Sequence, residues 1–210
     1  MGFLTSDPIA EKIGSGIENI RVIENFVSPE DLVQLVDFCK SKEQKENPGR
    51  SYTVDPNPEI YYLRQKYSKK MVETVSEYYE DTSRLRSYDP SSKFQQASFL
   101  IYPEGSSLSP HVDTVGLTQE DRIEDPLNAW TGHLAAIIYL NDNYEGGEIS
   151  FPDRGIDIKP KSGMLITFPG NKNYVHEVKE VISGTRLTLS IWIRFLEADK
   201  NPHYAWGIEE

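Results

Sequence analysis

The chain has four histidines, and one of them lies two residues before an aspartate, in His111-Val112-Asp113. On a strand or extended turn, residues i and i+2 point to the same side, so this imidazole and carboxylate can bind one ion. A third ligand from a later strand would complete a set of two histidines and one carboxylate, which leaves coordination positions open as non-haem Fe(II) oxygenases require. The His-x-Asp spacing arises easily by chance. The hypothesis therefore depends on His176, in the alternating run 174–178, whereas His133 and His203 are predicted not to be ligands.

Arg186 follows His176 by ten residues and begins a cleanly alternating run, 185–193. The two faces of this run differ in chemistry: Leu187, Leu189, Ile191 and Ile193 share one, and Arg186, Thr188, Ser190 and Trp192 share the other. A buried arginine needs an anionic partner, and a guanidinium binds carboxylates through two parallel hydrogen bonds. If the polar face lines a cavity, we expect a ligand carboxylate at Arg186 and Trp192 in the substrate pocket.

The elements that must position these residues change type along the chain. Ser28-Pro29 begins a predicted helix, with serine as N-cap and proline at the first helical position. A second helix is predicted over 59–79, after a polar loop. From residue 94 onward, short β-rich runs alternate with turn signals; a strand is also predicted over 21–27. The predicted later strands are 94–102, 134–140, 147–151, 163–168, 174–178 and 185–195. Two helices followed by many strands indicate an α+β protein with a sandwich, barrel or jelly roll.

Length and composition favour one globular domain over residues 17–200, with a loose lead-in at 1–16 and a tail at 201–210. The net charge of −11 disfavours general nucleic-acid binding, because an acidic chain repels phosphate backbones. No apolar run approaches the length of a membrane span, which is about 20 residues. The single cysteine, Cys39, fits a buried position in the first helix and a reducing compartment, so we expect a cytoplasmic protein.

Taken in order along the chain, the candidate residues and their flanking stretches resemble the 2-oxoglutarate/Fe(II)-dependent dioxygenase superfamily, and most of all its prolyl 4-hydroxylase branch. The resemblance extends over roughly residues 20–196. Its parts are His111-x-Asp113, His176, Arg186, Tyr102-x-x-Gly105, Tyr139-Leu140-Asn141, Gly146-Gly147-Glu148-x-x-Phe151 and the run 159–168. Each part is weak alone, and their ordered co-occurrence makes the pattern specific.

This resemblance implies a double-stranded β-helix, or jelly roll, with the helices packed outside it. It implies iron held by His111, Asp113 and His176, and 2-oxoglutarate and O₂ as cosubstrates, with ascorbate as a further candidate cofactor. Arg186 would bind the distal carboxylate of 2-oxoglutarate, with Tyr139 and Tyr102 as hydrogen-bonding helpers. The implied activity is hydroxylation of prolyl or other residues in a peptide or protein.

One position departs from the family pattern, because many members have a tyrosine three residues before the first histidine ligand and this chain has Leu108. An oxygenase of the same fold acting on a small molecule or nucleobase is therefore an alternative, as is a non-enzymatic, cupin-like metal-binding jelly roll. The long segment 114–131, which includes Trp130, is predicted to cover the substrate as a lid.

Overall fold

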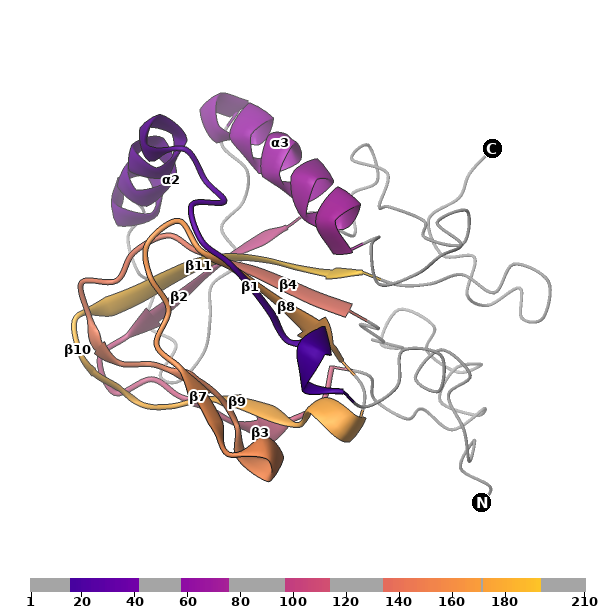
Figure 1. Ribbon diagram of the computed structural model, residues 1–210. Coiled ribbons are helices and arrows are strands. Elements are labelled where there is room, and N and C mark those ends of the chain that lie inside the picture. Colours follow the sequence, from indigo (N-terminus) through magenta and orange to yellow (C-terminus); the bar gives the residue numbers. More distant parts are fainter. Residues whose placement is uncertain (1–15, 42–57, 76–96, 114–133, 171, 194–210) are drawn as a thin grey trace, which may run out of the picture.

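Two antiparallel β-sheets, a two-stranded ribbon and two helices make up the part of the chain that the structure, a computed structural model, describes (Figure 1). The described residues are 16–41, 58–75, 97–113, 134–170 and 172–193. Both helices lie on one side of the larger sheet, and the smaller sheet lies on its other side (Figure 1). This arrangement is the predicted α+β fold with a jelly-roll core.

The larger sheet has five strands in the order β1-β8-β4-β11-β2. Their bounds are β1 (Arg21–Ile23), β2 (Ser98–Pro103), β4 (Leu134–Tyr139), β8 (Leu165–Pro169) and β11 (Thr185–Ile193). The first part of β11, Thr185 to Ser190, pairs with β2 on one edge, and its second part, Thr188 to Ile193, pairs with β4 on the other. In these pairings Arg186 lies opposite Tyr102, and Thr188 lies opposite Tyr139. The register therefore gathers three of the predicted site residues in one part of the sheet.

The smaller sheet has the order β3-β9-β6-β7, and the ribbon joins β5 to β10. The bounds are β3 (Leu108–His111), β5 (Glu145–Gly146), β6 (Ile149–Phe151), β7 (Ile156–Ile158), β9 (His176–Val178) and β10 (Val181–Ser183). His111 at the end of β3 lies opposite His176 at the start of β9. Directly opposite residues in antiparallel strands have Cβ atoms about 5 Å apart, so the register alone brings the two imidazoles together.

The two faces of β11 are buried in different surroundings, as its alternation predicted. Its four aliphatic residues belong to the apolar core that also contains the fully buried Leu35 and Met71 of the helices. On the opposite face Arg186, Thr188 and Ser190 are at most 1% exposed. Burial of a charged and two hydroxyl side chains on the interior face of a strand requires polar partners there.

Helix α2 (Pro29–Ser41) begins at the predicted residue. Ser28 is its N-cap as predicted, since Ser28 Oγ accepts a hydrogen bond from the Asp31 amide at 3.3 Å. Helix α3 (Pro58–Val75) begins one residue before the predicted start, and residues beyond 75 lie outside the described ranges.

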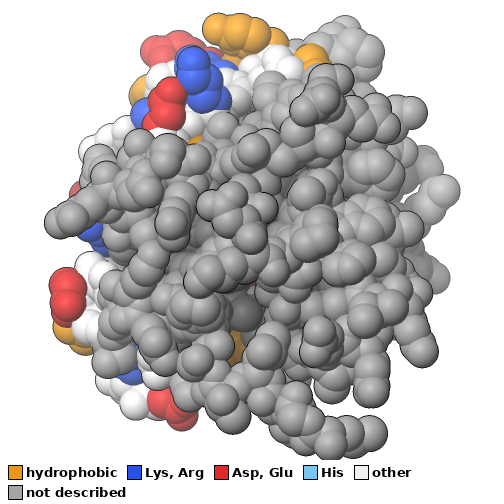
Figure 2. All heavy atoms as spheres, turned by 90° about the vertical axis from the view of Figure 1, so that its right-hand side faces the viewer, with side chains coloured by type: hydrophobic (Ala, Val, Ile, Leu, Met, Phe, Trp, Pro, Cys, Tyr) orange, Lys and Arg blue, Asp and Glu red, His pale blue; other side chains and the backbone are white. Residues whose placement is uncertain are grey.

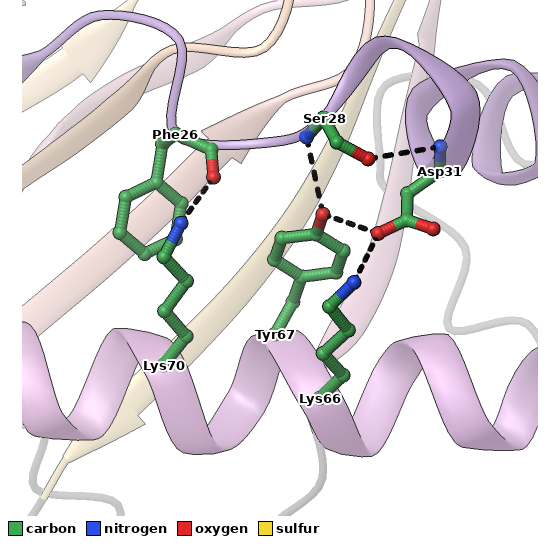
Figure 3. A network of polar contacts seen from close by, with 6 residues as sticks. All are labelled: Phe26, Ser28, Asp31, Lys66, Tyr67 and Lys70. Atoms are coloured by element: carbon green, nitrogen blue, oxygen red, sulfur yellow. Dashed lines mark hydrogen bonds and ion pairs between the residues drawn. The ribbon is translucent and has the colours of Figure 1, made fainter.

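A polar network joins the start of α2 to α3 (Figure 3). One carboxylate oxygen of Asp31 accepts hydrogen bonds from Tyr67 Oη at 2.7 Å and from Lys66 Nζ at 2.6 Å. The amide of Ser28 donates to the same tyrosine hydroxyl at 3.2 Å, and Lys70 donates to a backbone carbonyl just before α2. These contacts fix the helix pair over the sheet and include none of the candidate site residues.

Four strands (β3, β5, β7 and β10) were not predicted, and each is short or interrupted; β5 has only two residues. β3 contains Pro110, which lowers the strand signal because proline donates no ladder hydrogen bond. β7 and β10 have three residues each, too few to show a period. The strand predicted over 21–27 ends at Ile23, because Asn25 has a φ of 54° and turns the chain. The strand predicted from residue 174 starts at His176, after the 3₁₀ turn Lys172–Tyr174.

Several predictions concern residues outside the described ranges: the lid segment 114–131 with Trp130, His133, His203, and the lead-in and tail boundaries. Neither described helix is long and apolar enough to cross a membrane. In the space-filling view of Figure 2, most of the described side chains visible on that face lie along its left and upper margins, where acidic, basic and apolar groups are interspersed. The described residues on this face thus form no patch of a single charge sign.

Candidate metal centre and arginine cluster

The three residues predicted as metal ligands lie together at the start of β9 and the end of β3. One ligand atom from each of His111, Asp113 and His176 falls within 4.8 Å of the others. His111 Nε2 is 3.7 Å from one Asp113 carboxylate oxygen, and His176 Nε2 is 3.6 Å from the other. The carboxylate therefore lies between the two imidazole nitrogens, which is the donor set that the spacing predicted.

Backbone carbonyls orient both imidazole rings. His111 Nδ1 is 2.9 Å from the Ser109 carbonyl oxygen, and His176 Nδ1 is 3.0 Å from the Tyr174 carbonyl oxygen. Because a carbonyl only accepts, each Nδ1 carries the proton and each Nε2 presents its lone pair toward Asp113. A backbone acceptor on the outer nitrogen is the usual support of a metal-binding histidine.

Burial gives the two histidines and Asp113 protonation states that suit binding of a metal cation. It lowers the pKa of His176 to about 4 and also lowers that of His111, so both imidazoles are neutral at physiological pH. Burial raises the pKa of Asp113 to about 6, opposed by His111 and by a hydrogen bond from the Trp192 side chain. Asp113 Oδ2 has no hydrogen-bond partner in the described part of the chain. Two neutral nitrogens and an unsatisfied carboxylate oxygen fit a divalent metal ion.

Aromatic side chains exclude water from one side of His176. Its ring centroid is 4.6 Å from that of Phe168 and 6.1 Å from that of Phe151. Both phenylalanines are fully buried. An apolar surrounding strengthens the electrostatic interaction between the ligand atoms and a bound cation.

A second polar group, here named the arginine cluster, consists of Arg186, Tyr102, Tyr139 and Tyr144. The Arg186 guanidinium is 1% exposed, and its Nη2 donates to Tyr139 Oη at 3.1 Å. Its central carbon is 4.8 Å from the Tyr139 ring centroid and 4.9 Å from that of Tyr102. Within the described residues, Arg186 forms no ion pair with a carboxylate and its Nε has no hydrogen-bond partner. A buried cation in this state provides a site for an anionic ligand.

The sequence predicted three members of this cluster and missed Tyr144. That residue lies in the loop between β4 and β5, where no strand or helix period assigns a side chain to a face. Its position directly before the Glu145-Gly146-Gly147 turn was the available signal. Trp192, predicted to line a substrate pocket, is half-buried, and its side chain donates a hydrogen bond that lowers the pKa of Asp113. Its contact with a substrate stays a prediction.

Comparison with known proteins agrees with this geometry. Residues 97–194 match the family described as the 2OG-Fe(II) oxygenase superfamily. Human prolyl 3-hydroxylase 2 is 36% identical over 63 residues, a stretch that covers 28% of this chain and 9% of that protein. The chain thus corresponds to a small part of that relative's length.

Solved structures share the fold. A viral collagen prolyl hydroxylase from Paramecium bursaria Chlorella virus-1, in complex with 2OG, superposes with a TM-score of 0.63 at 21% identity, over 85% of this chain and 97% of that one. A Pseudomonas putida prolyl-4-hydroxylase gives a TM-score of 0.60 at 19% identity, over 90% and 99% of the two chains. The family match spans the strands that hold the histidines, the aspartate and the arginine, so residues 97–194 are similar to the 2OG-Fe(II) oxygenase superfamily.

Proposed function

We propose that the chain is an Fe(II)- and 2-oxoglutarate-dependent dioxygenase that hydroxylates prolyl residues of a peptide or protein. The observation that supports this most is the pairing of two incomplete sites in one jelly roll. One is a histidine-aspartate-histidine set with an unsatisfied carboxylate oxygen, and the other is a buried guanidinium with no carboxylate partner among the described residues. A metal ion would complete the first, and a dicarboxylate the second.

In this proposal His111, Asp113 and His176 hold Fe(II) through two Nε2 atoms and one carboxylate oxygen. Arg186 and Tyr139 hold the distal carboxylate of 2-oxoglutarate, and Tyr102 packs against the guanidinium. When bound, iron and 2-oxoglutarate supply the chemistry: with O₂ and a C–H bond, they yield succinate, CO₂ and a hydroxylated product. The protein's contribution is to fix both ends of the cosubstrate and to keep the two imidazoles neutral.

Prolyl residues are the proposed substrate class because the chain resembles proteins named for that activity, among them human prolyl 3-hydroxylase 2 and the viral collagen prolyl hydroxylase. The net charge of −11 also fits a peptide substrate better than a nucleic acid. Ascorbate is a further proposed cofactor.

The first experiment is to add Fe(II) and 2-oxoglutarate to the protein without oxygen and to record the visible spectrum. We expect a weak metal-to-ligand charge-transfer band that is lost in His176→Ala and weakened in Arg186→Ala. Absence of the band from a protein with verified bound iron would contradict the 2-oxoglutarate assignment and favour the cupin-like metal-binding protein.

A peptide screen then tests the substrate class. We expect proline-containing peptides to gain the mass of one oxygen atom, with succinate formed in equal amount. Activity on free small molecules or nucleobases, with none on prolyl peptides, would contradict the peptide assignment while leaving the oxygenase chemistry intact.

A further inference from the structure

Tyr144 has a buried hydroxyl that no residue in the described ranges satisfies. The side chain is 5% exposed, and its Oη has no hydrogen-bond partner there. It packs in a small apolar group with Tyr102, Val178 and Val181, against which the half-buried Leu108 also packs. A buried hydroxyl without a partner costs about 1–3 kcal/mol, so its retention here calls for a ligand that accepts its proton.

The backbone around Tyr144 fixes the position of the ring. The Asn141 amide group donates to Asn143 Oδ1 at 2.7 Å and to the Thr185 carbonyl at 2.8 Å, which ties the loop to the start of β11. Gly184, with a φ of +81°, lies against the backbone of Tyr144. A Cβ at position 184 would lie 3.2 Å from the Cα and Cβ of Tyr144, so a larger residue there would crowd Tyr144. Packing therefore fixes the position of the Tyr144 ring.

Tyr144 and Arg186 lie on the same side of Gly147. A Cβ added to Gly147 would lie 3.0 Å from Tyr144 Cε2 and 3.2 Å from Arg186 Cδ, so the phenol ring and the arginine side chain approach each other there. The guanidinium lowers the pKa of the Tyr144 phenol, but burial outweighs it and raises that pKa to about 12. The hydroxyl is therefore protonated and can donate at every physiological pH.

Two unsatisfied donors thus meet in the arginine cluster: Tyr144 Oη and Arg186 Nε. We propose that Tyr144 donates its hydroxyl proton to the distal carboxylate of 2-oxoglutarate beside Arg186, and so helps to select a dicarboxylate cosubstrate. This inference rests on the proposed function. It also explains how the cluster keeps a polar lining although Leu108 presents none: the hydroxyl comes from the loop before β5 instead of from β3.

The test compares two ligands that chelate iron alike. 2-Oxoglutarate and 2-oxobutyrate share the 2-oxo acid group, and only 2-oxoglutarate has a distal carboxylate. Each is titrated without oxygen into the Fe(II) protein, and the charge-transfer band gives the dissociation constant. In Tyr144→Phe we expect the dissociation constant for 2-oxoglutarate to rise at least about tenfold, the effect of losing a hydrogen bond to a charged group, and that for 2-oxobutyrate to stay unchanged.

Tyr67→Phe is the matched control, because Tyr67 is a buried tyrosine whose hydroxyl bonds to Asp31 and Ser28 instead of to the arginine cluster. It should change neither constant. A thermal scan without ligand tests folding: removal of an unsatisfied hydroxyl should not lower the Tm of Tyr144→Phe. The rise in Tm on adding 2-oxoglutarate should be smaller than in the wild type.

The outcomes separate this inference from the proposed function. If the wild-type iron protein binds no 2-oxoglutarate, the proposed function fails. Suppose instead that the wild type binds 2-oxoglutarate and that Arg186→Ala binds it more weakly. If Tyr144→Phe then binds 2-oxoglutarate as tightly as the wild type, the inference alone is overturned. An equal loss for both ligands in Tyr144→Phe would also overturn it, since the residue would then act through the metal or the fold.

Discussion

His111 and His176 lie opposite each other across the β3–β9 ladder, with ring centroids 4.3 Å apart. Two imidazoles so close would repel if both were protonated, and burial instead keeps them neutral. The ladder therefore builds half of the metal site before any metal binds, and Asp113 supplies the single negative charge.

Replacement of that charge is expected to remove metal binding. In Asp113→Asn the side chain keeps its shape and loses the carboxylate, so we expect the affinity for Mn(II), used as a redox-stable probe, to fall by at least about 100-fold. Calorimetric titration measures it. Asp157→Asn is the control, because that carboxylate is half-exposed and pairs with Lys179 on the surface of the smaller sheet. Equal affinity in the two variants would contradict the ligand role of Asp113.

The unpaired charge of Arg186 predicts opposite effects on stability and binding. Arg186→Met removes a buried cation that has no carboxylate partner among the described residues, so the free energy of unfolding without ligand should equal or exceed that of the wild type. Binding of 2-oxoglutarate should be weakened. Arg154→Met is the matched control, because Arg154 donates to the Asn173 carbonyl and stacks on a tyrosine ring, and its loss should destabilise. Urea denaturation with and without 2-oxoglutarate distinguishes the two.

Alanine substitutions at Gly147 and Gly155 distinguish the effect of side-chain crowding from that of backbone strain. Both glycines have a φ of +63°, so alanine at either site costs about 1 kcal/mol of strain. A Cβ at Gly155 meets nothing within 4 Å, whereas one at Gly147 meets Tyr144 and Arg186. We expect both variants to lose stability in denaturation, with a larger loss in Gly147→Ala, and only Gly147→Ala to bind 2-oxoglutarate more weakly. Equal behaviour of the two would mean that the arginine cluster tolerates displacement.

The helix network predicts a purely structural effect. Tyr67→Phe removes the hydroxyl that donates to Asp31 and accepts from the Ser28 amide, so unfolding should become easier by about 1–2 kcal/mol. Tyr62→Phe on the same helix is the control, since Tyr62 is 69% exposed and should change stability little. Metal affinity should be unchanged in both; a loss in Tyr67→Phe would link the helices to the site.

Residue type and spacing were sufficient to predict that His111, Asp113 and His176 lie together and that Arg186 is buried, because each lies on or beside a strand whose period assigns its side chain to a face. That they bind a metal and 2-oxoglutarate stays a prediction. The same logic fails where no period exists. Tyr144 lies in a loop, and it joins the arginine cluster through tertiary packing against Tyr102 and beside Gly147 and Gly184, which no local period predicts. β3 was missed because Pro110 interrupts it, although it holds His111. Long-range register, such as Arg186 opposite Tyr102, is a tertiary property that local patterns do not encode.

Cys39 was predicted to be buried, and its surroundings make a chemical prediction. The thiol is 2% exposed in the core beneath α2, and burial raises its pKa from 9.0 to about 12. We expect a thiol-reactive dye at pH 8 to leave the native protein unlabelled and to label it fully in concentrated urea. Because the unfolded thiol ionises first, the wild type should lose stability between pH 9 and about 12 relative to Cys39→Ala. Rapid labelling of the native protein would show that α2 opens readily from the sheet, and would predict a parallel loss of protection in its amide hydrogens.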